Sequence, residues 1–363
     1  MASINDWTGI KTEEVKEYVE QNGVANIDEF FKKKLKSWQD VEVNIGITGD
    51  TGAGKSSYIN AIRGFEDDDE GAAEVGVKET TKKPTCYDHP TNPKIKFWDL
   101  PGIGTPNYPD LETYCKEVKL ETYDAFLIFT SNRFTANDQQ LAKKIRSIDK
   151  RFFFIRAKLM TMFALRSVKR SNHDPAKWEF AKLTQAILDA LPTYQRESLT
   201  LSLDILTSLS PQFLQRKVQV LKTRMWMVAS LSAAAAVVPI PGVSIAVDLG
   251  LIMNEISFYK SQLGLPDEGS PRFAMLSVST QVEVKALCSI LAGSVSKLVM
   301  LIAAYASEQA AEEVIRLIPF VGSLVSGAMS FVSTFFFLKH YLKRMEKAAE
   351  LVIKEAFQNL QID

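Results

Sequence analysis

Apolar runs in the first half of the chain alternate between strand-like and helix-like patterns. Runs with the length and pattern of strands span Val41–Ile47, Lys94–Asp99, Asp124–Thr130 and Arg151–Arg156. Ser56–Ile62 lacks glycine and proline and is followed by Gly64, as expected of a helix. A second helix is predicted to start at Asn137. Strands that alternate with helices predict an α/β fold with a doubly wound, mostly parallel sheet and its ligand at the strand carboxyl ends.

Helical spacing dominates the two ends of the chain. Residues 1–40 contain two apolar runs, and the second includes Ile27, Phe31 and Leu35. These N-terminal helices need a partner surface, which either the α/β domain or a distant helical segment can supply. From Trp178 onward helix formers prevail and no clear strand pattern remains. We therefore expect an all-helical C-terminal half.

Two long uncharged stretches, 225–247 and 317–338, are each long enough to cross a bilayer, for which about 20 residues suffice. Both are interrupted by proline, at Pro239 and at Pro319. Two interpretations stay open: buried core helices, which we favour, and segments that insert into or dock on a membrane. We predict that the last helix, Lys339–Leu360, is amphipathic and either closes the bundle or lies on a membrane surface.

Composition narrows the class of protein. The 363 residues carry 43 basic and 43 acidic side chains, so the chain lacks the electrostatic footprint of a nucleic-acid-binding protein. Cys86, Cys115 and Cys288 are too few and too scattered for a disulfide framework or a zinc site, which is typical of a reducing compartment. The first residues contain no secretory signal. We therefore expect a cytoplasmic protein that does not bind nucleic acid.

The stretch from Gly49 to Ser56 fits the phosphate-loop pattern G-x-x-x-x-G-K-[ST]. Its glycines let several backbone N–H groups converge on one polyphosphate, and the next predicted element is a helix N-terminus, which favours anions. Lys55 supplies a positive charge for the outer phosphates, and the Ser56 hydroxyl is a ligand for Mg²⁺. We predict that the nucleotide contacts Gly49, Asp50, Thr51, Gly52, Ala53, Gly54, Lys55, Ser56 and Ser57.

Two further motifs predict the parts that sense the γ-phosphate. Asp99 ends a predicted strand and is followed by Gly102 in a D-x-x-G pattern, so Asp99 is expected at the Mg²⁺ ion and Gly102 at the phosphate. Thr80 and Thr81 lie where a first switch closes over the metal, and we favour Thr81. Ile103 occupies the position at which many GTPases use glutamine to orient water. Hydrolysis therefore needs another residue or a partner.

The guanine-reading motif N/T-K-x-D is incomplete. The chain offers Ala157-Lys158-Leu159-Met160, so Lys158 is a candidate contact to the nucleotide but methionine replaces the aspartate. A paired contact to a base edge is worth roughly 1–3 kcal/mol of discrimination. We therefore expect guanine selection to weaken by about one to two orders of magnitude. The helix and strand that should follow are largely missing, so the α/β domain is predicted to be shortened.

Four of these segments, Gly49–Ser57, Gly76–Thr81, Phe97–Gly104 and Asp124–Arg133, resemble the immunity-related (interferon-inducible) GTPases. The likeness covers the first 156 residues well and resumes around Trp178–Trp226. It implies a P-loop GTPase domain over 41–208 and a helical domain built from 1–40 and 209–363. It also implies nucleotide-dependent self-association or pairing with related GTPases through this domain, reversible association with intracellular membranes, and defence against intracellular pathogens. By the same resemblance Glu79 assists hydrolysis across a dimer.

Two functions from different classes stay open. The first is a Mg²⁺-dependent GTPase, with Glu79, Lys55 and Thr81 as its catalytic residues, that assembles on membranes. The second is a non-hydrolysing nucleotide-binding scaffold that regulates active relatives by pairing with them. An ATPase of another phosphate-loop group ranks third, because Asp99–Gly102 is a GTPase-style switch.

Overall fold

The computed structural model forms two compact units, one from Trp38–Phe213 with Asn359–Asp363 and one from Met1–Ser37 with Leu214–Gln358. We call them the sheet unit and the helical unit. The structure describes residues 17–18, 20–22, 27–75, 83–104, 108–131, 133–156, 179–207, 210–235, 243–289 and 325–359.

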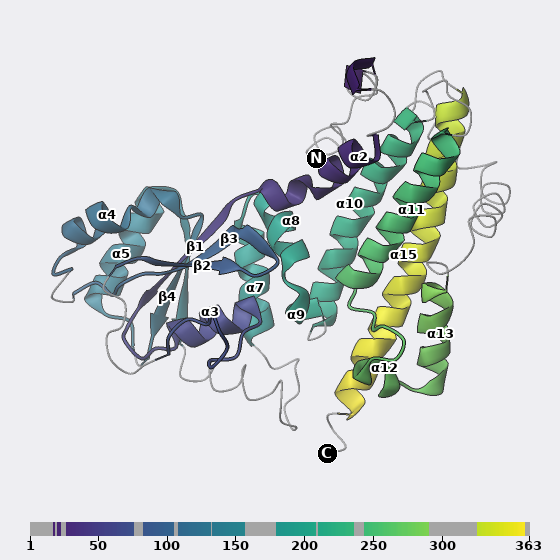
Figure 1. The fold of residues 1–363 in the computed structure, drawn as a ribbon. Coiled ribbons are helices and arrows are strands. Elements are labelled where there is room, and N and C mark those ends of the chain that lie inside the picture. Colours follow the sequence, from purple (N-terminus) through teal and green to yellow (C-terminus); the bar gives the residue numbers. More distant parts are fainter. Residues whose placement is uncertain are drawn as a thin grey trace. The chain divides into compact units, whose positions relative to one another are not determined.

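A five-stranded sheet in the order β2-β3-β1-β4-β5 is the centre of the sheet unit (Figure 1). Its strands are β1 (Val43–Gly49), β2 (Thr85–His89), β3 (Asn92–Asp99), β4 (Ala125–Thr130) and β5 (Arg151–Arg156). Neighbouring strands are parallel except β2 and β3, which pair antiparallel. The predicted α/β fold with a mostly parallel sheet is therefore confirmed.

Helices cover both faces of the sheet. The helices of this unit are α3 (Lys55–Arg63), α4 (Leu111–Val118), α5 (Ala136–Ser147), α7 (Glu179–Ala190), α8 (Thr193–Ser202) and α9 (Asp204–Thr207), with 3-10 turns η2 (Ser37–Asp40) and η3 (Leu120–Thr122). Side chains alternate between two cores: Ile47 and Leu127 pack with α3, α7 and α8, whereas Phe126 and Ile128 pack with α4 and α5. Because strands buried on both faces need apolar side chains at every position, β4 is apolar from Ala125 to Phe129.

Two details of the sheet unit differ from the predictions. Helix α5 is capped by Thr135, whose hydroxyl accepts from the N–H of Asp138 while the Asp138 carboxylate accepts from the N–H of Thr135. This reciprocal pair outcompetes Asn137, so that prediction is wrong by two residues. Strand β2 had no predicted counterpart, because an edge strand with exposed Cys86 and Asp88 lacks a strong apolar signal.

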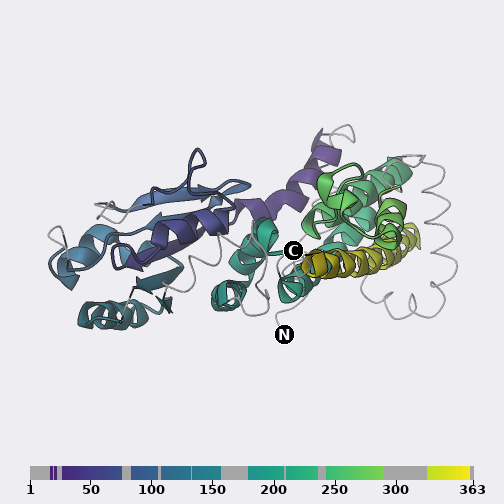
Figure 2. The ribbon, with the colours of Figure 1, turned by 90° about the horizontal axis from the view of Figure 1, so that it is seen from below.

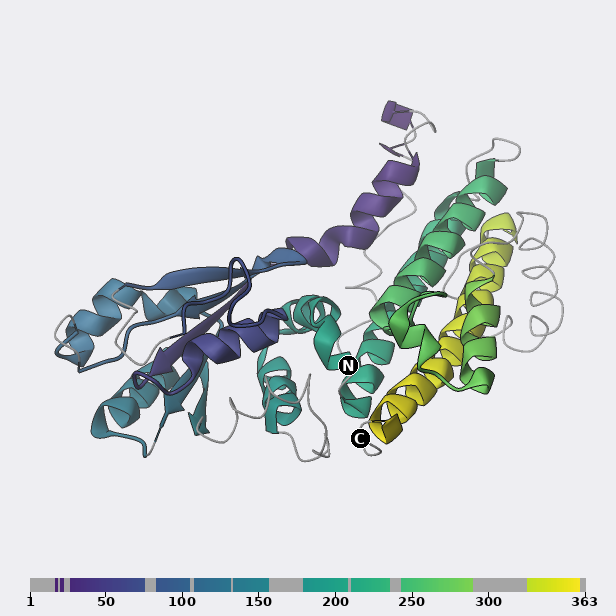
Figure 3. The same cartoon turned by 60° about the horizontal axis from the view of Figure 1, so that its bottom comes forward.

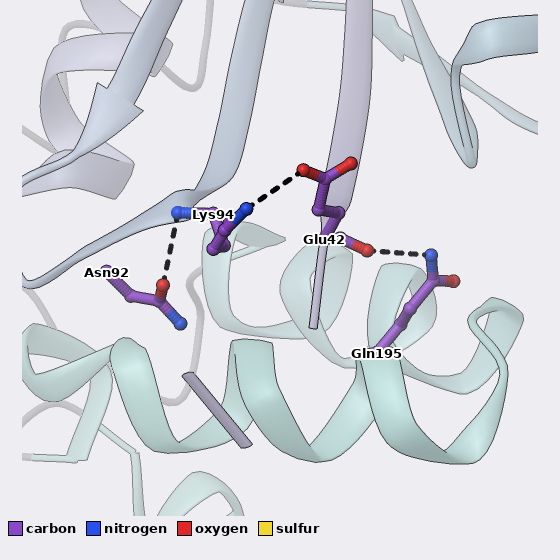
Figure 4. A network of polar contacts seen from close by, with 4 residues as sticks. All are labelled: Glu42, Asn92, Lys94 and Gln195. Atoms are coloured by element: carbon purple, nitrogen blue, oxygen red, sulfur yellow. Dashed lines mark hydrogen bonds and ion pairs between the residues drawn. The ribbon is translucent and has the colours of Figure 1, made fainter. Parts of the chain in front are cut away.

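The strand amino ends are held to α8 by polar contacts (Figure 4). Gln195 Nε2 donates to the Glu42 carbonyl at 2.9 Å, and Lys94 Nζ lies 3.2 Å from the Glu42 carboxylate. Asn92 donates to the Ser198 and Ser202 hydroxyls. Side chains therefore cover the amino ends of β1 and β3. The loops that follow β1, β3 and β4 lie at the carboxyl ends of the strands.

The helical unit consists of α2 (Ile27–Lys36), α10 (Pro211–Ala235, whose first turn belongs to the sheet unit), α11 (Val243–Gln262), α12 (Pro271–Ala274), α13 (Val278–Cys288) and α15 (Val325–Asn359). Helices α10 and α15 run antiparallel, with Gln215 bonded to Glu350 and Ser232 to Thr334 (Figure 3). Helix α13 lies along α15, where Arg344 pairs with Glu283 at 2.8 Å (Figure 2). The predicted last helix over Lys339–Leu360 is present but starts earlier, at Val325, because no glycine or proline interrupts α15 after Gly327.

A buried ion pair lies at the centre of the helical unit. Arg224 Nε donates to both carboxylate oxygens of Glu255, at 2.8 and 3.0 Å, and Glu255 has no exposed surface. The same guanidinium donates to the carbonyl of Leu35 and lies over the Phe258 ring, 4.2 Å from its centroid. Arg224 on α10 therefore joins α11 to the last turn of α2.

The described parts of the two uncharged stretches pack against each other. The Trp226 ring lies 4.5 Å from that of Phe335, and Val228 and Phe337 are fully buried. These parts behave as core helices in the structure. Among the residues that the structure describes, no helix combines the length and the apolarity that a membrane span requires.

Candidate functional site

The loop between β1 and α3 is shaped by glycines with left-handed backbone conformations. Gly49 has φ +124°, and a Cβ there would lie only 1.9 Å from the Phe129 carbonyl oxygen of β4. Gly54 caps α3 with φ +88° and contributes no side-chain hydrogen bond to the helix. The N–H groups of the first turn of α3 are thus left to face the loop. A glycine-rich loop that leads into a helix N-terminus is the arrangement that an anion site requires.

Lys55 lies along the loop. Its Nζ donates to the carbonyl of Gly49 at 3.1 Å and to that of Asp50 at 3.0 Å. These two bonds hold the ammonium group against the first residues of the loop. Ser56 follows it in the first turn of α3, where its hydroxyl is half-buried. A positive charge, a hydroxyl and a helix N-terminus therefore lie within one turn of chain.

Asp99 ends the neighbouring strand at the same edge of the sheet. It pairs in register with Ile47, two residues before Gly49, and the N–H of Leu100 donates to the Ile47 carbonyl at 2.8 Å. The Asp99 side chain is 3% exposed. Burial and then the Asp99 charge raise the pKa of Tyr87 on β2, which keeps that phenol neutral. The buried carboxylate thus lies beside the loop, as expected for parallel strands.

The segment after Asp99 is held to β1. The Thr48 hydroxyl donates to the Pro101 carbonyl and lies 3.0 Å from the Tyr114 hydroxyl. Gly102 is half-buried, and Ile103 packs against the core that contains α4 and α5. Ile103 therefore has neither the polar atom nor the orientation needed to hold a water molecule.

Asn60 on α3 fixes the chain that leads to the predicted first switch. Its amide donates to the Ala73 carbonyl at 3.0 Å and accepts from the Ala73 N–H at 2.6 Å, and it also reaches Asp67. Asn60 is fully buried. The exposed acidic segment Asp67–Glu70 is thus anchored by Asn60, a role that a single asparagine in a helical pattern does not reveal.

Several predicted site residues lie outside the described part of the chain. These are Glu79, Thr80 and Thr81 of the first switch and Ala157–Met160 with Lys158. The residues that the structure brings together at one edge are Gly49–Ser57, Asp99 and Gly102.

Beside β4 the sheet ends at β5 in the described residues, on the side where the sequence predicts the nucleotide base. The ring of Phe154 on β5 packs at a tilt against that of Phe134, with centroids 4.2 Å apart, and both residues remain about two-fifths exposed (43% and 40%). No strand is described beyond β5 among residues 179–207, where helices α7 to α9 lie. The expectation of a shortened domain rests on residues between 157 and 178, which lie outside this range.

The donor set suits a hard cation. A hydroxyl on Ser56 and a buried carboxylate on Asp99 are oxygen ligands, which Mg²⁺ prefers, and Mg²⁺ typically takes its remaining ligands from phosphates and water. The described residues contain no cluster of three or more His, Cys, Asp or Glu side chains that would form a protein-only metal cage. The site therefore fits a metal that arrives with its phosphates.

Comparison with known proteins gives matches along nearly the whole chain. The sequence model described as "Interferon-inducible GTPase (IIGP)" matches residues 10–166 and 168–361. Interferon-inducible GTPase 5 of Rattus norvegicus is 30% identical over 366 residues, which cover 90% of this chain and 78% of that protein. T-cell-specific guanine nucleotide triphosphate-binding protein 2 of Mus musculus is 33% identical over 284 residues, covering 69% and 67%. Interferon-gamma-inducible GTPase 10 of Mus musculus is 26% identical over 375 residues, covering 93% and 87%.

Proposed function

Because the chain belongs to the interferon-inducible (immunity-related) GTPase family, whose members bind GTP, we propose that it binds GTP and GDP at the β1–α3 loop and hydrolyses GTP to GDP and phosphate. We further propose that it assembles in a nucleotide-dependent way on intracellular membranes, from the cytoplasm, in innate immune defence. The observation that supports nucleotide binding best is the convergence of Lys55, the α3 N-terminus and buried Asp99 at one sheet edge.

Each residue in the proposal has a distinct task. Lys55 and the N–H groups of the loop neutralise the charge of the β- and γ-phosphates. Ser56 and Asp99, joined by Thr81, hold Mg²⁺, which supplies charge stabilisation at the phosphates when bound. Glu79 positions the attacking water from across a dimer, because Ile103 packs into the core and cannot do so.

A binding titration tests the first part of the proposal. Purified protein is titrated with fluorescent GTP, GDP and ATP in Mg²⁺ and again in EDTA. We expect binding that Mg²⁺ strengthens for GTP, and a loss of at least about tenfold in affinity for Lys55→Ala, because a charge-assisted contact worth about 1.5–3 kcal/mol is removed.

The same titration separates the base preference from the phosphate site. With Met160 in place of the aspartate, we expect GTP to be preferred over ATP by less than about a hundredfold, since the paired contact worth roughly 1–3 kcal/mol is absent. Equal affinities of wild-type protein and Lys55→Ala for every nucleotide would contradict the proposed site.

The packing of Ile103 favours a second candidate, a nucleotide-binding scaffold that pairs with active GTPases without hydrolysing GTP. Steady-state turnover per protein molecule, measured over a range of protein concentrations, distinguishes the two. If Glu79 acts across a dimer, turnover per molecule rises with concentration, and Glu79→Gln abolishes the rise. Near-zero turnover at every concentration, with nucleotide binding retained, would instead identify the scaffold.

A further inference from the structure

Asp50 introduces a negative charge into a loop that is to hold a polyphosphate. Its carboxylate is turned toward the end of β4, where Oδ2 accepts from the Thr130 hydroxyl at 3.2 Å and from the Ser131 N–H at 3.4 Å. Thr130 is the last residue of β4, which neighbours β1 in the sheet, and Ser131 follows it. The side chain thus bridges the loop and the carboxyl end of β4.

The backbone of Asp50 is held in the same place. Its N–H donates to the Phe129 carbonyl at 3.0 Å, and its own carbonyl accepts from the Ala53 N–H at 3.2 Å and from Lys55 Nζ at 3.0 Å. Asp50 therefore contacts both the fixed end of β4 and the part of the loop that carries Lys55. A displacement of Asp50 would move the ammonium and the N–H groups beside it.

We propose that Asp50 is a positioning residue of the nucleotide site, whose carboxylate, held by Thr130 and Ser131, fixes the phosphate loop against β4. This inference rests on the proposed function, because it concerns the affinity of the same site. It assigns to the Asp50 side chain a role toward the protein and none toward the ligand.

The Thr130 hydroxyl explains why a carboxylate suits this position. Thr130 is fully buried and its hydroxyl also lies 3.0 Å from the Arg133 carbonyl, but it has only one hydrogen to donate. A charged acceptor forms the stronger bond, so Asp50 competes well with the neutral carbonyl. The Ser131 N–H supplies the second donor to the same carboxylate oxygen.

Removing the Asp50 carboxylate can either weaken or strengthen nucleotide binding. The direction shows whether the carboxylate positions the loop or is only a negative charge that repels the phosphates. If the carboxylate has no positioning role, its removal relieves repulsion of the phosphates and nucleotides bind more tightly. If it positions the loop, Asp50→Ala weakens binding although a negative charge has been removed. Thr130→Val removes the donor of the bond between Thr130 and Asp50 without changing the charge. Both variants therefore weaken binding only if the Asp50 carboxylate positions the loop.

The experiment compares GDP and GTP affinities, in Mg²⁺, of the full chain and its variants. We expect Asp50→Ala and Thr130→Val each to bind about tenfold more weakly, and the double variant to lose little more than Asp50→Ala alone, because Asp50→Ala already removes the bond that Thr130→Val removes. Asp50→Asn keeps an acceptor oxygen but loses the charge that lets it compete with the Arg133 carbonyl, so it should recover only part of the affinity that Asp50→Ala loses.

Two matched controls report general destabilisation. Thr200→Val removes a buried hydroxyl bonded to the Arg196 carbonyl on α8, and Asp124→Ala removes a carboxylate that accepts from the Asn44 N–H at the opposite end of the strands. Neither should change affinity. Unchanged or tighter binding by Asp50→Ala and Thr130→Val, with wild-type protein binding nucleotide, overturns this inference alone. Wild-type protein that binds no nucleotide overturns the proposed function as well.

Discussion

Replacing Arg224 by alanine is expected to lower the free energy of unfolding of the helical unit by about 3–5 kcal/mol. The change leaves the Glu255 carboxylate, which has no exposed surface, without the guanidinium that contacts both of its oxygens. It also removes the donor to the Leu35 carbonyl at the end of α2. Urea denaturation of the full chain, followed by circular dichroism, measures the loss.

Variants of both partners separate the buried charge from the packing. Arg224→Met combined with Glu255→Leu should be more stable than Arg224→Ala, because no unpaired charge remains. Lys285→Ala, which breaks an exposed pair with Glu268 in the same unit, should cost only about 0–1 kcal/mol. Equal stability of Arg224→Ala and wild-type protein would show that the ion pair contributes nothing net.

The pH dependence of Arg224→Ala follows from the direction of the Glu255 shift. Burial raises the pKa of Glu255 in the folded chain, and Arg224 opposes that rise. Without Arg224 the folded state binds a proton on Glu255 at pH values where the unfolded state has lost it. Stability then falls as pH rises through this window and recovers as pH drops toward about 4.3, the unfolded value. The difference from wild-type protein should therefore shrink in acid.

Gly49→Ala is expected to reduce nucleotide affinity by at least about a hundredfold, which corresponds to about 2.7 kcal/mol. The new Cβ would lie 1.9 Å from the Phe129 carbonyl oxygen, and φ +124° is strained for any residue with a side chain. The loop must leave β4, which breaks the bond from the Asp50 N–H to Phe129. Titration with fluorescent GDP measures the loss.

Gly52→Ala is the matched control within the same loop. Gly52 also has a left-handed φ of +71°, but a Cβ there meets no atom within 4 Å. In Gly52→Ala the backbone is strained by about 1 kcal/mol, but the new Cβ meets no other atom. The nucleotide affinity of this variant should therefore fall by no more than about tenfold. If both alanine variants bind equally well, the contact with Phe129 is not what requires glycine at position 49.

The sequence predicted the sheet unit well where apolar periodicity was strong. Strands β1, β3, β4 and β5 are confirmed: β1 and β4 are buried almost throughout and need apolar runs, β3 alternates, and β5 carries the apolar run Phe152–Ile155 although it is partly exposed. Strand β2 escaped prediction because an edge strand needs apolar side chains on only part of one face. The continuity of α15 was missed because a change from apolar to amphipathic composition does not itself end a helix.

The phosphate loop was located from spacing alone, but the contacts that hold it were not. The bond between Asp50 and Thr130 joins residues 80 positions apart, and the pair of Arg224 with Glu255 joins residues 31 apart on different helices. Charged residues in helical patterns are usually solvated, so nothing local distinguishes Arg224 from its basic neighbours. Such partners are set by tertiary packing, which local sequence patterns do not encode.

The bond from Arg224 to Leu35 spans 189 residues, and it constrains the order in which the chain can fold during synthesis. The sheet unit comes almost wholly from the continuous segment Trp38–Phe213, so it can fold once that segment has left the ribosome. Helix α2 emerges earlier but cannot dock until α10 and α11 have been translated. At about 5–20 residues per second, α2 waits roughly 10–40 seconds for Arg224. A chaperone that binds short amphipathic helices would meet this chain during that interval.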